Sequence, residues 1–425
     1  MMYQKILFNP DEIFPEPLKK YELFFSLLDL SCRGPLKQVG RRPISRAALM
    51  RALIFKNLRS LATLSDLVAE LDERPSLSIL LGLKPGRLPV ERLSSFLRDT
   101  DHLWFCKIRE SLVKKLIHLQ VIKGHYLSLD ACPIQAKVRE NNLKTSVKNR
   151  FCKETPPRHD PEARLGVMAT FPSSKKKVQF FWGYRNHMIN DAVSELPLVE
   201  MTLPANVRGT SVVQSQFCFV KEQLGLRPKA VLGDSEYDSA KIIESIVKEL
   251  GARARIARNI RGGASPSVKF SPSGAPICMA GFSMVSRGTF WDRKEKRKRH
   301  KFVCPIRGSK KFAASHPYCP WFHPQFVKGS GCYKNIRIDV DETIRQSIDY
   351  GSESFKKDYN KRTSSERIFS RLLSLLMQSP TVKGLRATAN CCTIAHITVL
   401  AVAYFAYFVK EPNKIRFVKS FLANF

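Results

Sequence analysis

The chain has 425 residues, of which 71 are Lys or Arg and 37 are Asp or Glu, so its formal net charge is +34. With 44% hydrophobic residues and only 25 prolines and 21 glycines, it can bury cores, which excludes a disordered basic tail. Length predicts two or three domains. Because neutralising phosphates releases counterions, a basic excess in a foldable chain predicts a polyanionic partner, and we expect nucleic acid.

An apolar stretch near the C-terminus has almost the length that a bilayer demands. Residues 391–409, CCTIAHITVLAVAYFAYFV, contain no Lys, Arg, Asp or Glu. They include Thr393, His396 and Thr398, so we expect a helix buried in a large core, with a membrane span as the weaker alternative.

The start of the chain and its cysteines bear on location. The segment MMYQKILFNPDEIF has acidic residues where the apolar run of a signal peptide should be. Eleven cysteines without such a signal predict reduced thiols or metal ligands rather than disulfides. We therefore expect a cytoplasmic protein associated with DNA and not with a membrane.

From Gly40 to about Leu116 the pattern is helical with short loops. Ser45 is placed to cap the helix that begins RAALMRALIF, and Thr63 or Ser65 to cap the one that contains LVAELDE. The pattern fits a small basic DNA-binding domain, but a helical bundle with no DNA role fits it equally well.

Two later segments predict strands that carry aspartates. GHYLSLDACPIQAKV predicts a strand from Tyr126 to Ala131 with Asp130 at its C-terminal end. KAVLGDSEYDSAKIIESIVKELGARARIARN predicts a βαβ unit in which Asp234 ends the first strand. Between them, residues 141–174 predict an exposed loop and KKVQFFWGYRNHMIND a strand or hairpin. In open α/β sheets, ligand chemistry lies beyond the carboxyl ends of strands, so both aspartates are candidates.

Residues 262–350 are rich in glycine, proline, cysteine and basic residues and predict an insertion. Zinc would bind the thiolates tetrahedrally, but the segment has no Cys-x-x-Cys pair, so free buried cysteines are the alternative. The run RKEKRKRHK at 293–301 predicts a solvated loop that grips DNA phosphates without reading sequence. The candidate ligands of a structural Zn²⁺ are Cys278, Cys304, Cys319 and Cys332.

The stretch YNKRTSSERIFSRL supplies a third carboxylate. At helical spacing, Tyr359, Arg362, Glu366, Phe369 and Leu373 share one face, which by itself predicts an amphipathic helix with an Arg–Glu pair. With the two aspartates, Glu366 completes the carboxylates that two-metal phosphoryl transfer requires, and hard oxygen ligands suit Mg²⁺ or Mn²⁺.

The order of these segments resembles the DDE transposases of bacterial insertion sequences, in the large "IS-four"-like group. The signature Tyr-x2-Arg-x3-Glu is matched by Tyr359, Arg362 and Glu366. SLDACPIQA resembles the segment of the first aspartate, VLGDSEYDS that of the second and FFWGYRNH the hairpin between them. The similarity spans roughly residues 40–410, and one position departs from it, because the signature continues with lysine where this chain has Leu373.

The resemblance implies an α/β fold with an RNase H-like catalytic core, a mixed sheet flanked by helices, and an all-α N-terminal domain. It implies a helical DNA-binding domain at 1–120, the first part of the core at 121–261, the Cys-rich basic insertion at 262–350, and the C-terminal helical part of the core at 351–425. It further implies double-stranded DNA, at transposon ends and target, as the partner of a homodimer or higher oligomer.

The implied activity is cleavage of a phosphodiester at each transposon end, followed by attack of the freed 3′-hydroxyl on target DNA. Asp130, Asp234 and Glu366 would be the catalytic ligands of two metal ions. The implied or candidate DNA contacts are Tyr359, Arg362, Arg367, Lys383 and Arg386.

Each candidate also has a structural interpretation. Asp130 alone fits a turn, Asp234 fits a cap for the following helix, and Glu236 and Asp238 fit residues at a helix start. His187 fits a buried structural histidine better than a residue near the scissile phosphate. The alternatives for the whole chain are a nuclease without strand transfer and a catalytically silent DNA-binding derivative of a transposase.

Overall fold

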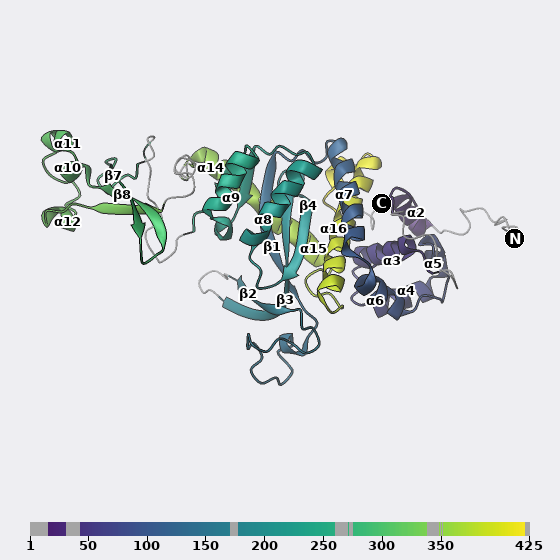
Figure 1. Ribbon diagram of the computed structural model, residues 1–425. Helices are drawn as coiled ribbons and strands as arrows, with labels where there is room; N and C mark the ends of the chain where they lie inside the picture. The colour runs from purple at the N-terminus through teal and green to yellow at the C-terminus, as the bar shows by residue number, and fades with distance from the viewer. Residues whose placement is uncertain are drawn as a thin grey trace. The chain divides into compact units, whose positions relative to one another are not determined.

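The computed structural model describes residues 16–30, 43–170, 177–259, 271, 275–337, 348, 350 and 352–420 (Figure 1). It is a mixed α/β fold in which a mixed sheet is flanked by helices. The chain forms two compact units, one comprising Met1–Gly124, Ser128–Leu226 and Thr363–Phe425, the other His125–Leu127 and Arg227–Arg362. The stretch from Tyr359 to Glu366 therefore contributes to both units.

In the first unit, the described residues before Gly124 are mainly helical, and the helices between Arg46 and His118 are joined by short loops. Thr63 caps its helix in a reciprocal capping box with Asp66, whereas Ser45 precedes its helix without a side-chain cap bond. The helices are α2 (Glu16–Ser26), α3 (Arg46–Arg59), α4 (Leu64–Glu73), α5 (Pro75–Leu80), α6 (Val90–Asp99) and α7 (His102–His118).

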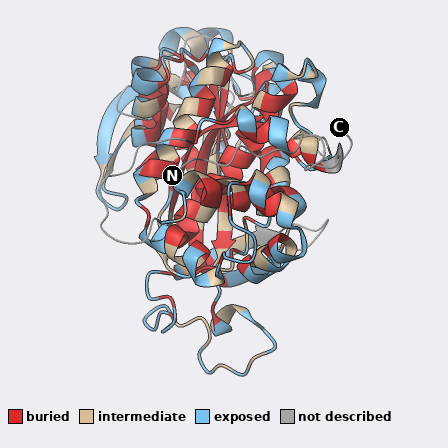
Figure 2. Cartoon of the chain, turned by 90° about the vertical axis from the view of Figure 1, so that its right-hand side faces the viewer, coloured by how far each residue is buried: buried red, intermediate tan, exposed pale blue. Residues whose placement is uncertain are grey.

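The apolar C-terminal stretch forms α16 (Leu385–Phe408), which packs against α3, α6, α7 and β4 (Figure 1). In the described part of the chain it is the one helix long and apolar enough to cross a membrane, and 78% of its most apolar window is buried inside the protein. The prediction of a buried core helix is confirmed, and Figure 2 shows buried residues concentrated on the strands and on the inner faces of the helices.

The strands of the first unit are β1 (Tyr126–Gln135), β2 (Arg164–Thr170), β3 (Lys177–Asp191) and β4 (Leu196–Pro204), in the order β2-β3-β1 with β4 also paired to β3. Both β2 and β4 run antiparallel to β3, with Arg164 opposite Gly183 and Tyr184 opposite Pro204. The prediction that 141–174 is all exposed loop was wrong, because β2 forms there through its pairing with β3. Helix α8 (Gly209–Cys218), which continues as the turn Phe219–Gln223, packs on β3.

A close approach between β3 and β1 explains the glycine in FFWGYRNH. A Cβ atom built on Gly183 would lie 2.0 Å from the carbonyl oxygen of Ile134. Only glycine therefore allows the two strands to approach so closely at this point.

In the second unit, β5 (Ala230–Gly233) and β6 (Arg253–Ile256) are parallel and are connected by α9 (Ala240–Glu244) and the turn Ser245–Glu249. The predicted βαβ unit is confirmed. The start of β1 also belongs to this unit, and Lys229 N donates to His125 O at its edge.

The segment with the Tyr-Arg-Glu signature is not one continuous helix, so the prediction of a single face was wrong. Helix α14 (Glu353–Tyr359) ends at the tyrosine, and the 3₁₀ turn η5 (Asn360–Arg362) separates it from α15 (Thr363–Ser374). On α15 the buried residues include Ser364, Ser365, Ile368, Phe369 and Leu372, while Glu366 is exposed.

Residues 275–337 of the second unit contain an antiparallel sheet, in the order β7-β8-β9, and short helices. The run 293–301 is only partly a loop: after a turn it continues into β8, where His300 stacks on buried Phe302. The elements are β7 (Val285–Asp292), β8 (Arg297–Val303), α10 (Pro305–Gly308), α11 (Lys310–Ser315), α12 (Pro324–Val327) and β9 (Tyr333–Arg337).

Candidate active site

Asp130 is half-buried in the middle of β1, and its Oδ1 accepts a hydrogen bond of 2.8 Å from Ala131 N. The prediction that the strand ends here was wrong, because β1 continues through Pro133 to Gln135. Proline lacks an N–H, but Gln135 N still donates to Gln378 O at 2.7 Å, so extended structure persists past it.

A buried polar contact links β1 to the helix of Glu366. Ser365 Oγ lies 2.8 Å from Ser128 Oγ and also 2.8 Å from Oδ1 of Asn190 on β3. Asn190 Nδ2 in turn donates to Ser364 Oγ at 3.1 Å. All four side chains are fully buried, so α15 packs on the sheet through hydrogen-bonded polar groups rather than apolar ones.

This contact places Asp130 and Glu366 in the same neighbourhood of the first unit. Residues two apart in a strand point to the same side, so Asp130 projects from the face of β1 that carries Ser128. Glu366 is the next residue after Ser365. Each carboxylate is therefore one or two residues away from a single hydrogen-bonded pair.

Asp234 follows β5 directly in the second unit, as the sequence predicts. Its Oδ1 accepts from Glu236 N at 2.9 Å and so caps the short 3₁₀ turn η3 (Ser235–Tyr237), rather than α9. Asp238 is buried and accepts from Asn259 N at 2.9 Å, which suits a structural role. Of the neighbouring acids, Asp234 is thus the one at the strand end.

Tyr359 and Arg362 belong to elements that pack on the strand preceding Asp234. Within the second unit α14 packs on β5 and β6, and η5 packs on β5. Tyr359 stacks on Phe355 with ring centroids 5.7 Å apart, and the Arg362 guanidinium lies 5.8 Å from the Tyr359 ring centroid. Arg362 and Asp234 therefore belong to segments that meet at β5.

The other predicted DNA contacts lie on the first unit. Arg367 donates from Nε to Glu195 Oε1 at 2.7 Å and is therefore engaged in an ion pair, although half of its side chain is exposed. Lys383 and Arg386 are exposed around the start of α16, and Leu373 is half-buried. The roles of all four in DNA binding or catalysis remain predictions.

Sequence reasoning missed the buried polar residues that orient these elements. Besides the serines, Arg109 Nη1 pairs with Glu200 Oε1 at 2.7 Å, and Thr393 Oγ1 donates to the same oxygen at 2.7 Å. Burial favours the neutral acid, but Arg109, two histidines and Thr393 together lower the pKa of Glu200. Thr393 and His396 are polar residues within the otherwise apolar sequence of α16, and they were the sequence signal for buried polar contacts there.

His187 is buried on β3, and its carbonyl accepts from Gln216 Nε2 at 3.0 Å.

Within the described residues, no three His, Cys, Asp or Glu side chains are arranged to hold a metal ion. The metal-ligand roles of Asp130, Asp234 and Glu366 therefore stay predictions.

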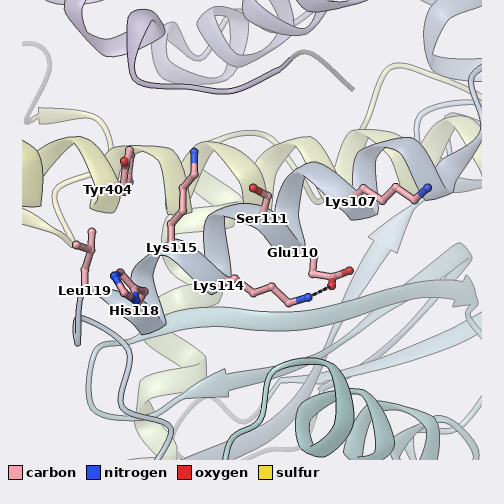
Figure 3. A pocket seen from close by; sticks show the side chains of 8 residues that line it. All are labelled: Lys107, Glu110, Ser111, Lys114, Lys115, His118, Leu119 and Tyr404. Carbon is pink, nitrogen blue, oxygen red and sulfur yellow. Dashed lines mark hydrogen bonds and ion pairs between the residues drawn. The ribbon is translucent and has the colours of Figure 1, made fainter. Parts of the chain in front are cut away.

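A basic hollow lies on the surface of α7 (Figure 3). The Lys115 ammonium lies 5.5 Å from the ring centroid of Tyr404 of α16, and Lys114 pairs with Glu110. All of the lining side chains except Tyr404 come from α7 and the residue after it. The lining residues are Lys107, Glu110, Ser111, Lys114, Lys115, His118, Leu119 and Tyr404.

No protein-family model and no curated protein matches the chain. Among solved structures, the chain is similar to a protein chain in the cryo-EM structure of a piggyBac transposase synaptic complex with hairpin DNA. The match covers 96% of this chain and 80% of that chain, at 13% sequence identity and a TM-score of 0.39.

Proposed function

We propose that the chain is a DDE transposase that cleaves phosphodiester bonds at transposon ends and joins the freed 3′-hydroxyl to target DNA. One observation carries the proposal: the carboxylates occur in order, Asp130 within β1, Asp234 directly after β5 and Glu366 on α15, with Tyr359 and Arg362 before the last. In the first unit the Ser128–Ser365 contact supports it, and in the second the packing of η5 on β5.

In this proposal the three carboxylates hold two Mg²⁺ or Mn²⁺ ions in an RNase H-like core. Carboxylate oxygens are the donors that these hard cations prefer. Bound metal would activate the attacking oxygen and neutralise charge on the leaving one. Arg362 offers a guanidinium for bidentate contact with a DNA phosphate, and stacked Tyr359 helps to hold that guanidinium in place.

The charge of the chain supplies the rest of the DNA interface. A net charge of +34 favours phosphate binding through counterion release. The basic hollow on α7 and the exposed Lys383 and Arg386 are surfaces for such contacts. We propose that a homodimer or higher oligomer holds two transposon ends and target DNA.

The test is cleavage and strand transfer on labelled DNA that carries the ends flanking the coding sequence, with Mg²⁺ or with EDTA. We expect the wild type to cut and join these ends only with metal. Glu366→Gln should abolish both steps while DNA binding persists, because the amide cannot replace a charged ligand. Glu353→Gln, on the exposed surface of α14, is the matched control and should stay active.

Two results would contradict the proposal and identify a different function. Metal-dependent cutting without joining would identify a nuclease. Binding of the ends with neither cutting nor joining would identify a silenced transposase and would point to Leu373, where the signature has lysine.

A further inference from the structure

The four cysteines of the segment 275–337 converge on one small cavity, although they come from separate turns. Cys278 lies in a tight turn closed by its N–H bond to Phe282 O, and Cys304 precedes α10. Cys319 lies between α11 and α12, and Cys332 precedes β9. All four line a cavity of about 10 Å³, which has room for about one water-sized particle and excludes an organic ligand.

Two of these cysteines are joined directly through their backbones. Cys304 N donates to Cys332 O at 2.8 Å, which fixes the two backbones side by side. Cys304 and Cys319 are buried.

The apolar core around these cysteines is small. Its buried members are Cys304, Ile306 and Cys319, supported by a few partly buried side chains. Large apolar residues nearby remain exposed, among them Tyr318, Trp321 and Phe322. A module with so little core of its own ordinarily needs a metal or a disulfide to hold it. All four cysteines are free thiols in the structure.

We propose that Cys278, Cys304, Cys319 and Cys332 bind one structural Zn²⁺ ion that holds this module together. As the structure stands, no three described side chains of the required types are arranged to hold a metal. Binding must therefore draw the sulfurs together and release their protons, which couples metal affinity to pH and to folding. His323 also lines the cavity, but its Nδ1 accepts from Gln325 N at 3.2 Å, so the four thiolates are the better ligand set.

The test measures the metal content of the full chain, which needs no DNA and no transposition activity. After reconstitution with Zn²⁺ under reducing conditions and dialysis, we expect one Zn²⁺ per chain by elemental analysis. The variants Cys278→Ser and Cys332→Ser should each lose most of it. Cys218→Ser, which removes an exposed thiol of α8, is the matched control and should keep it.

Cobalt substitution tests the ligand set in the same chain. Bound Co²⁺ should give the intense absorption of a tetrahedral four-thiolate site, weakened in Cys319→Ser and unchanged in His323→Ala. A folded wild-type chain that retains no Zn²⁺ would overturn the proposal. So would a loss of metal in Cys218→Ser equal to that in Cys278→Ser, or Co²⁺ absorption without thiolate character.

Discussion

Ser365 Oγ of α15 and Ser128 Oγ of β1 lie 2.8 Å apart in a fully buried site. The contact joins residues 237 positions apart in sequence, next to Glu366 on one side and two residues before Asp130 on the other. Because Asn190 bonds both Ser364 and Ser365, the helix has one favoured register on the sheet. Apolar contacts alone would fix the register of a helix on a sheet less specifically.

Ser365→Ala should destabilise the protein by about 1–3 kcal/mol, because Ser128 and Asn190 lose a buried hydrogen-bond partner. Ser370→Ala, at an exposed position of the same helix, should have little effect. Urea unfolding of the two variants and the wild type measures the difference. Equal unfolding midpoints for all three would show that the serine contact does not hold α15 on the sheet.

Gly183→Ala should disrupt the pairing of β3 with β1, because the added methyl group meets the Ile134 carbonyl at 2.0 Å. We expect a loss of several kcal/mol or failure to fold, since backbone atoms cannot move aside as a flexible side chain can. Thermal unfolding and soluble yield are the measurements. Val178→Ala, at an exposed end of β3, should fold normally, and comparable stability of the two variants would contradict the close approach.

Arg109→Met should cost about 3–5 kcal/mol, because it leaves the carboxylate of Glu200 buried without its partner. Arg98→Met removes an exposed pair with Asp99 and should change stability little. Denaturant unfolding of both variants provides the comparison. A small effect of Arg109→Met would mean that Glu200 is stabilised by its other hydrogen bonds.

Acid should weaken the fold through His396, whose pKa burial lowers to about 4 from 6.5. Between these values the unfolded chain takes up a proton that the native chain does not, so stability falls as pH drops from 6.5 towards 4. Glu200 raises and Arg109 lowers the pKa of this histidine. The loss attributable to His396 is at most roughly 3 kcal/mol. Unfolding free energies at pH 7, 6 and 5 should fall less steeply in His396→Asn.

Reversing charge in the hollow on α7 should weaken DNA binding. The double variant Lys107→Glu, Lys114→Glu should bind a DNA duplex less tightly than the wild type. Its affinity should also depend less steeply on salt, with the slope of log K against log salt concentration reduced by about one unit for each DNA phosphate that is no longer neutralised. Binding titrations at several salt concentrations measure both quantities. The control, Lys84→Glu with Lys248→Glu, makes the same change in net charge at exposed sites elsewhere. Equal weakening in the two double variants would show that only total charge matters.

Local sequence determined the elements whose signals are short-range. The βαβ unit around Asp234 follows from an apolar strand and a helical segment that ends before Gly251. The capping box at Thr63 and the buried helix α16 were predictable for the same reason, since their spacing and apolar content lie within a single segment. Candidate catalytic residues also came from the sequence, through the order in which three carboxylates occur.

Tertiary structure alone decided what depends on residues distant in the chain. Strand β2 exists because β3 pairs with it. Extended structure continues past Pro133 because the carbonyl oxygens of Gln378 and Trp182 accept hydrogen bonds from the N–H groups of Gln135 and Ala136. No local sequence pattern indicates the 3₁₀ turn η5 or the hydrogen bonds by which Ser128 and Asn190 hold α15 on the sheet. A single segment shows its own periodicity and caps, but hydrogen bonds between buried polar groups form only when separate segments meet, because each group needs a partner that its own segment lacks.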